Sequence, residues 1–113
     1  MNLITTLQVT ALLFLTGLLE IGGGWFIWQT VRKGWPWWWA ILGSALLIAY
    51  GFTPTLQPLP QFGRLYAVYG GIFIAFSYCW GYFIDGMKPD LGDVIGSVLA
   101  TVAICIILFW PRF

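Results

Sequence analysis

The sequence predicts an all-α integral membrane protein, a bundle of four transmembrane helices in a single domain over 1–113, and two observations carry this prediction. Of the 113 residues, 60% are hydrophobic and only 8% are charged, which is too little charge to cover a soluble domain. The apolar residues gather in four runs, each close to the ~20 residues that cross a bilayer as a helix. The expected helices span about 3–31, 35–53, 63–84 and 91–110.

The junction between the first two expected helices is typical of a membrane interface. Arg32 and Lys33 end the first helix, and Gly34 follows them. The run WPWWW at 35–39 then adds four tryptophans, which gather beside cations where a helix leaves the bilayer. We expect Pro36 in the first turn of the second helix, because that position does not use the N–H that proline lacks.

The other two connections carry turn-forming residues. The segment PTLQPLP at 54–60 holds three prolines, so we expect the second helix to stop before it and an extended connection to follow. Asp85 and Gly86 favour a turn after the third helix. Asp90 and Asp93 resemble an acidic variant of the capping box, and we expect them to open the fourth helix.

The basic residues give the chain only a weak orientation in the membrane. With four spans, Arg32, Lys33 and Lys88 fall on one side, and Arg64 and Arg112 fall on the other. Three cations against two slightly favour both termini outside the cytoplasm. Two copies of such a balanced chain, inserted in opposite directions, would reproduce the inverted repeats with which transport folds enclose a midplane site.

Composition and motifs argue against an enzyme and against several binding functions. The chain has no histidine, no glycine-rich loop with a lysine and no Ser-His-Asp set. Its two cysteines, Cys79 and Cys105, lie inside expected helices, where a thiol acts as a small apolar side chain. A net charge of +1 gives no electrostatic case for nucleic acid. We therefore expect no catalytic residue, metal site, cofactor or nucleic-acid partner.

One carboxylate, Glu20, stands inside the apolar stretch TGLLEIGGGWFIW at 16–28. A charge at the bilayer centre costs at least ~2.5 kcal/mol, so this side chain should face a protein interior or a wet cavity. Its neighbours at helical spacing are small or weakly polar, namely Thr16, Gly17, Gly24 and Ile27. The glycines at 22–24 further indicate close packing, a kink or room for a ligand.

The chemistry expected of Glu20 is the exchange of a proton for a cation. Partial withdrawal from water favours the neutral form of a carboxylic acid, and two facing Glu20 side chains in a homodimer would disfavour double ionisation. Ionisable residues inside membranes are functional by default, so we expect Glu20 to bind both proton and substrate. The alternative is a protonated Glu20 that only hydrogen-bonds to a neighbouring helix.

The third expected helix offers a complement to Glu20. Aromatic and small residues recur along one face at helical spacing: Tyr66, Tyr69, Gly70, Phe73, Ser77 and Trp80. Aromatic faces attract organic cations by roughly 0.5–2 kcal/mol each, and tyrosine hydroxyls can hold a carboxylate in place. We expect the site to include four of these residues, namely Tyr66, Tyr69, Ser77 and Trp80. Ordinary aromatic packing between helices is the alternative.

Two further features concern the membrane faces and self-association. Arg64 and Gln57 are candidates for gating or headgroup contact, with lipid anchoring the simpler interpretation of Arg64. The fourth expected helix carries a ridge of small residues of the kind that brings transmembrane helices together: Gly92, Gly96, Ala100 and Ala103. We predict that this ridge joins two copies, although packing within one subunit would use the same residues.

Several segments together resemble the YnfA family of small four-helix membrane proteins, and the resemblance covers nearly the whole chain. They are LLEIGGGWFIW at 18–28, TLQP at 55–58, FGRLYAVYGGIF at 62–73, and the WG, DG and KPD elements between Trp80 and Asp90. That family is similar in turn to the small multidrug resistance transporters of the drug/metabolite transporter superfamily. Those are antiparallel homodimers that exchange protons for cationic drugs or guanidinium compounds.

The resemblance implies a multi-pass protein of the bacterial plasma (inner) membrane and assigns roles to three residues. Glu20 matches the first-helix glutamate that binds proton and substrate in the transporters. Tyr66 resembles the third-helix tyrosine near it, and Tyr69 takes the place of their third-helix tryptophan.

The function predicted from the sequence is proton-coupled export of a small cationic or aromatic substrate across the lipid bilayer. The chain would act as a homodimer, in a parallel or an antiparallel arrangement, with Glu20 as the shared site. Two other functions stay open: a non-transporting membrane partner protein and a passive ion channel. A partner protein would tolerate Glu20→Gln, because an amide still forms hydrogen bonds, and a channel would conduct without a proton stoichiometry.

Overall fold

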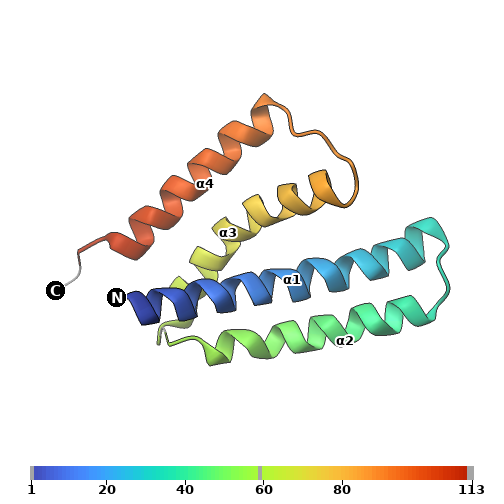
Figure 1. The fold of residues 1–113 in the computed structure, drawn as a ribbon, viewed down its shortest axis with the longest axis horizontal. Coiled ribbons are helices and arrows are strands. Elements are labelled where there is room, and N and C mark those ends of the chain that lie inside the picture. Colours follow the sequence, from blue (N-terminus) through green and yellow to red (C-terminus); the bar gives the residue numbers. More distant parts are fainter. Residues whose placement is uncertain (1, 59, 112–113) are drawn as a thin grey trace. The chain divides into compact units, whose positions relative to one another are not determined.

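The structure is a computed structural model that describes residues 2–58 and 60–111, and those residues form helices and no strand (Figure 1). The elements are α1 (Leu3–Lys33), α2 (Trp38–Phe52), the 3-10 helix η1 (Thr53–Leu56), α3 (Phe62–Phe83) and α4 (Leu91–Phe109). The prediction of an all-α chain with four main helices is confirmed. Arg112, which entered the charge balance, lies outside the described residues.

Three of the described helical segments are long and apolar enough to cross a membrane: Leu3–Lys33, Trp38–Leu56 and Leu91–Phe109. Helix α3 has 22 residues, which is enough for a bilayer, but it also carries Arg64 and several tyrosines and glycines that make it more polar. The crossing of α3 therefore stays a prediction.

The chain forms two compact units, Met1–Pro60 and Gln61–Phe113. In the first unit α1 packs along α2 and η1, and in the second unit α3 packs on α4. Each unit is a helical hairpin, coloured blue to green for the first and yellow to red for the second in Figure 1.

In the first unit, the backbones of α1 and α2 touch where Gly23 lies against Gly43. A Cβ atom on Gly43 would lie 2.6 Å from the Gly23 carbonyl oxygen, and a Cβ atom on Gly23 would lie 2.7 Å from the Gly43 carbonyl oxygen. The two backbones are thus in contact, with no room for a side chain between them. Of the interpretations open for the glycine run, close packing holds at Gly23.

Two expectations about α2 are wrong. The helix begins at Trp38 rather than near residue 35, and Pro36 precedes it, with the Pro36 carbonyl accepting a turn-like bond of 3.1 Å from the N–H of Trp39. At the other end the chain does not become extended at Pro54. The helical path continues as η1, because Pro54 occupies its first turn, where a missing N–H costs nothing.

The other helix ends follow the expected chemistry. Gly34 closes α1 with φ of 76°, and Gly86 forms the turn after α3 with φ of 72°, a left-handed conformation that favours glycine. The capping box of α4 is confirmed: the Asp90 N–H donates to Asp93 Oδ2 and the Asp93 N–H donates to Asp90 Oδ1, both at 2.9 Å.

An aromatic cluster lies at the end of the hairpin where α1 passes into α2. Ring centroids of Trp25 and Trp35 are 5.4 Å apart, those of Trp35 and Trp39 are 5.5 Å apart, and Phe26 stacks on Trp39 at 5.3 Å. Arg32 and Lys33 form the last turn of α1 beside this cluster. This grouping of aromatic rings and cations agrees with the predicted membrane interface.

The glycine contact predicts a large difference between two alanine substitutions in α2. Gly43→Ala should lower the thermal stability of the purified protein, because the new methyl group meets the backbone of Gly23. Gly51→Ala is the matched control: no atom outside its own helix lies within 4 Å of that Cβ, so the gain in helix propensity of about 1 kcal/mol should leave stability unchanged or higher. Melting followed by circular dichroism in nanodiscs measures both. Equal melting temperatures for Gly43→Ala and wild type would contradict the backbone contact.

Candidate functional site

Glu20 lies within α1 and is half-buried. It is the one acidic residue of this 31-residue helix. Thr16, Gly17 and Gly23 are buried, and they stand three or four residues away from Glu20, on the same face of the helix. The carboxylate is therefore on the side of α1 that takes part in packing, as the cost of a charge in lipid requires.

A buried pair of threonine hydroxyls lies one turn before Glu20. Thr16 is only 2% exposed, and its Oγ1 lies 2.8 Å from the Oγ1 of Thr53 in η1. Thr16 Oγ1 also lies 2.6 Å from the carbonyl of Leu12, and Thr53 Oγ1 lies 2.9 Å from the carbonyl of Tyr50. The two hydroxyl groups thus have two hydrogens for three contacts, so they can exchange hydrogen bonds while both side chains stay in position.

Sequence reasoning identified Thr16 as a neighbour of Glu20 but missed Thr53. In the sequence Thr53 marks only the end of an apolar run. It reaches Thr16 because the chain continues helically into η1 and because the glycine contact holds α2 against α1. A polar residue at the end of a span, followed directly by proline, was the only available signal.

The other side of Glu20 is open. Gly24 stands one turn after Glu20 and is exposed, and a Cβ atom at Gly24 would meet nothing within 4 Å outside its own helix. Ile27 is half-buried. Glu20 therefore lies between a packed polar neighbour at Thr16 and free space at Gly24, which is an arrangement that can admit a ligand to a carboxylate.

Gln57 is buried and hydrogen-bonded to α1. It is 9% exposed, and its Nε2 donates to the carbonyl of Val9 at 3.2 Å. Its Oε1 is buried and accepts no hydrogen bond from the described residues. Among the described residues, the Gln57 amide therefore pairs through its nitrogen alone.

Arg64 has a different setting in the second unit. It stands in the first turn of α3, is exposed, and donates from Nη1 to the Oε1 of Gln61. An exposed guanidinium at the start of a helix suits contact with lipid phosphates.

The aromatic face predicted for α3 forms a continuous ladder of rings. Centroids are 4.4 Å apart between Phe62 and Tyr66, 6.5 Å between Tyr66 and Tyr69, and 5.7 Å between Tyr69 and Phe73. Tyr69 is buried and Tyr66 is half-buried. Beside Gly70 there is open space, because a Cβ atom there would meet nothing within 4 Å outside its own helix.

Ser77 and Trp80 lie in the C-terminal half of the predicted α3 face. The hydroxyl of Ser77 donates to the carbonyl of Phe73 at 2.8 Å, within its own helix. Trp80 is half-buried. Glu20 belongs to the first unit, whereas Tyr66 and Tyr69 belong to the second, so a site shared by the carboxylate and the tyrosines stays a prediction.

The ridge of small residues on α4 is largely exposed. Gly92, Gly96 and Ala103 are exposed, and Ala100 is half-buried. Contact with α3 is made at Ile104 and at the Ala100 end of the ridge: a Cβ atom on Gly71 would lie 2.7 Å from Cδ1 of Ile104 and 3.5 Å from the Ala100 carbonyl oxygen. Within the second unit, packing on α3 therefore leaves most of the ridge uncovered.

The remaining candidates for chemistry are groups of metal ligands and the two thiols. No group of three or more potential metal ligands occurs among the residues that the structure describes. Cys79 and Cys105 are both exposed, free thiols.

Comparison with known proteins identifies the family. A family model described as "Uncharacterised BCR, YnfA/UPF0060 family" matches residues 6–113. A UPF0060 membrane protein of Arthrobacter sp. (strain FB24) is 52% identical over 108 residues, which is 95% of this chain and 96% of the relative. The UPF0060 membrane protein YfjF of Bacillus subtilis (strain 168) is 48% identical over 105 residues, 92% of this chain and 96% of the relative. No solved structure gives a significant match. The chain is a membrane protein that belongs to the YnfA/UPF0060 family.

Proposed function

We propose that this protein exports small cationic or aromatic compounds from a bacterium in exchange for protons, acting as a homodimer in the inner membrane. One observation carries the proposal: Glu20, the one acidic residue of the apolar helix α1, is half-buried, with the buried Thr16 on one side and open space at Gly24 on the other. Intramembrane carboxylates in such positions serve ion and substrate pathways.

The coupling follows from the chemistry of one carboxylate. Glu20 can hold a proton or pair with a cation, and it cannot do both, because protonation removes the charge that attracts the cation. If the site opens to one membrane side at a time, inward movement of protons drives outward movement of substrate. The membrane potential adds roughly 2.3 kcal/mol per elementary charge per 100 mV, which is a useful driving force for a cation exporter.

A second copy of the chain would supply the helices that one copy lacks for an enclosed pathway. Four helices cannot surround a closed pathway with two gates, and inverted repeats are the usual solution in transporters. The exposed residues Gly92, Gly96 and Ala103 of α4 give a surface on which a second α4 can pack closely. The aromatic ladder of α3, which includes Tyr66 and Tyr69, supports a lining that attracts the cation held at Glu20.

Replacement of Glu20 tests the proposal most directly. Purified protein in sealed liposomes with an internal pH dye should release protons when guanidinium or quaternary ammonium compounds are added on one side. In Glu20→Gln this substrate-driven proton movement should fall to the level of protein-free liposomes, because an amide has no proton to exchange. Glu20→Asp should retain part of it, and Asp85→Asn, a loop acid outside α1, should retain all of it.

The same experiment separates the other functions. Conduction of a cation down its gradient, with no proton movement, would identify a passive channel. An absence of flux in wild type for every compound, together with unchanged behaviour of Glu20→Gln, would support a non-transporting partner protein. Substrate-driven proton movement that survives in Glu20→Gln would remove the chemistry from this residue.

A second prediction concerns Gln57 as a gating residue. Gln57→Leu removes one donor and one unmatched buried acceptor, so the free energy of unfolding should change by less than about 1 kcal/mol in either direction. The rate of exchange should nevertheless fall, because the link between the α2–α3 connection and the Val9 carbonyl is lost. The matched control is Gln8→Leu at an exposed position of α1. Unchanged exchange in Gln57→Leu would exclude a gating role.

A further inference from the structure

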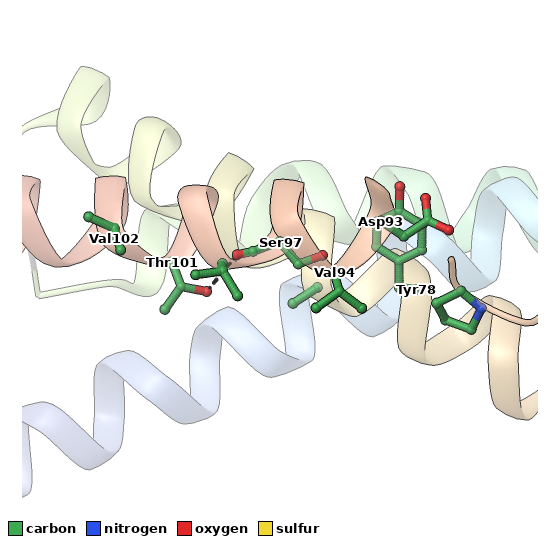
Figure 2. A pocket seen from close by; sticks show the side chains of 9 residues that line it. Tyr78, Asp93, Val94, Ser97, Thr101 and Val102 are labelled. Atoms are coloured by element: carbon green, nitrogen blue, oxygen red, sulfur yellow. Dashed lines mark hydrogen bonds between the residues drawn. The ribbon is translucent and has the colours of Figure 1, made fainter. Parts of the chain in front are cut away.

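The second unit holds a groove between α3 and α4 that the proposed transport site does not use. It has a volume of about 430 Å³, and Figure 2 shows the α3 and α4 side chains that line it. Its lining includes Ala75 and Tyr78 of α3 and Asp93, Val94, Val98 and Val102 of α4. All of these residues lie in one unit, so the groove is a property of the α3–α4 hairpin alone.

Most of the groove is apolar. The side chains of Val94, Val98 and Val102 follow one another along α4 and are exposed. Thr101 also lines it, but its hydroxyl donates to the carbonyl of Ser97 at 2.9 Å, as the dashed line in Figure 2 marks. Because the hydroxyl is satisfied within the helix, this position adds little polarity to the trough.

One end of the groove carries a fixed negative charge. Tyr78 of α3 and Asp93 of α4 both line this end, and Oδ2 of Asp93 accepts from the N–H of Asp90 at 2.9 Å. Figure 2 shows the tyrosine ring and the carboxylate together at this end. Asp93 is the one charged side chain that lines the groove, and it lies in the first turn of α4, next to the polar connection from α3.

We propose that this groove binds single-chain organic cations that enter it from the bilayer. The cationic head would pair with Asp93 beside the face of Tyr78, and the alkyl tail would lie along Val94, Val98 and Val102. From Asp93 to Val102 the helix rises about 14 Å, enough for a medium-length alkyl chain. A volume of about 430 Å³ suits one chain and a small head better than a two-chain lipid, and the carboxylate disfavours anionic amphiphiles.

The predicted dimer contact leaves the apolar part of this groove uncovered. At 100° per residue, Gly92, Gly96 and Ala103 fall on nearly the opposite side of α4 from Val94 and Val98, and Asp93 lies about a quarter turn from these three residues. A second copy packed on Gly92, Gly96 and Ala103 would therefore leave the trough at Val94 and Val98 open. Binding here is independent of the proposed exchange at Glu20, so either proposal can fail while the other holds.

The test uses the full chain in phosphatidylcholine nanodiscs and a photoreactive probe. The probe is decyltrimethylammonium with a diazirine near the end of its tail, and mass spectrometry locates the residues that it modifies after irradiation. Unlabelled decyltrimethylammonium, decanol and decyl sulfate are then added as competitors. We expect modification at Val98 or Val102, and we expect the cation to compete about fivefold better than decanol.

Three variants make the test specific. Asp93→Asn keeps an oxygen for the Asp90 N–H and removes only the charge, so it should abolish the preference for the cation over decanol. Val98→Phe should reduce modification by filling the trough. Asp85→Asn removes a carboxylate that does not line the groove and should behave as wild type.

Several outcomes would overturn the proposal. Equal competition by cation and decanol in wild type would show a groove for any hydrocarbon chain, including lipid tails. Modification outside the groove would place the probe elsewhere, and a cation preference that persists in Asp93→Asn would remove the proposed charge pairing. Loss of helical content in a variant would be seen by circular dichroism, and the wild-type competition series decides the question without it.

Discussion

The contact between Gly23 and Gly43 is the constraint on which the first unit depends. Because neither residue has a side chain, the backbones of α1 and α2 touch, and this contact fixes where along α1 every later residue of α2 falls. Thr53 consequently meets Thr16, and Gln57 meets the Val9 carbonyl. Two polar side chains that meet α1 before Glu20 are thus placed by a contact between two residues that have no polar side chain.

The sequence predicted the end of a helix well where residues at that end determine it by themselves. Gly34 and Gly86 adopt the left-handed turns that glycine favours, and Asp90 and Asp93 cap α4 as their spacing indicated. It predicted less well around Pro36 and Pro54. A proline shows which backbone N–H is missing. Whether that residue lies before a helix, as Pro36 does, or inside a 3-10 turn, as Pro54 does, depends on tertiary packing.

The same distinction, between features of one helix and contacts between helices, applies to the candidate site. Glu20 stood out because a carboxylate in an apolar helix is costly, and that argument needs no neighbours. The aromatic ladder of α3 was likewise visible from helical spacing, since Tyr66, Tyr69 and Phe73 repeat every three or four residues. Thr53 and the groove beside Asp93 could not be found this way, because both join residues from different helices.

Polar residues are distributed differently along the two helices of the second unit. The acidic residue of α4, Asp93, lies in its first turn, and the rest of the helix carries no charged residue, as lipid requires. Helix α3 instead carries hydroxyls and glycines along its length, with Tyr69 buried and Tyr82 exposed. A helix of this kind is costly to leave against hydrocarbon tails, because its polar groups need partners. In the proposed homodimer, α4 would meet lipid and a second copy, and α3 would line the interior that Glu20 requires.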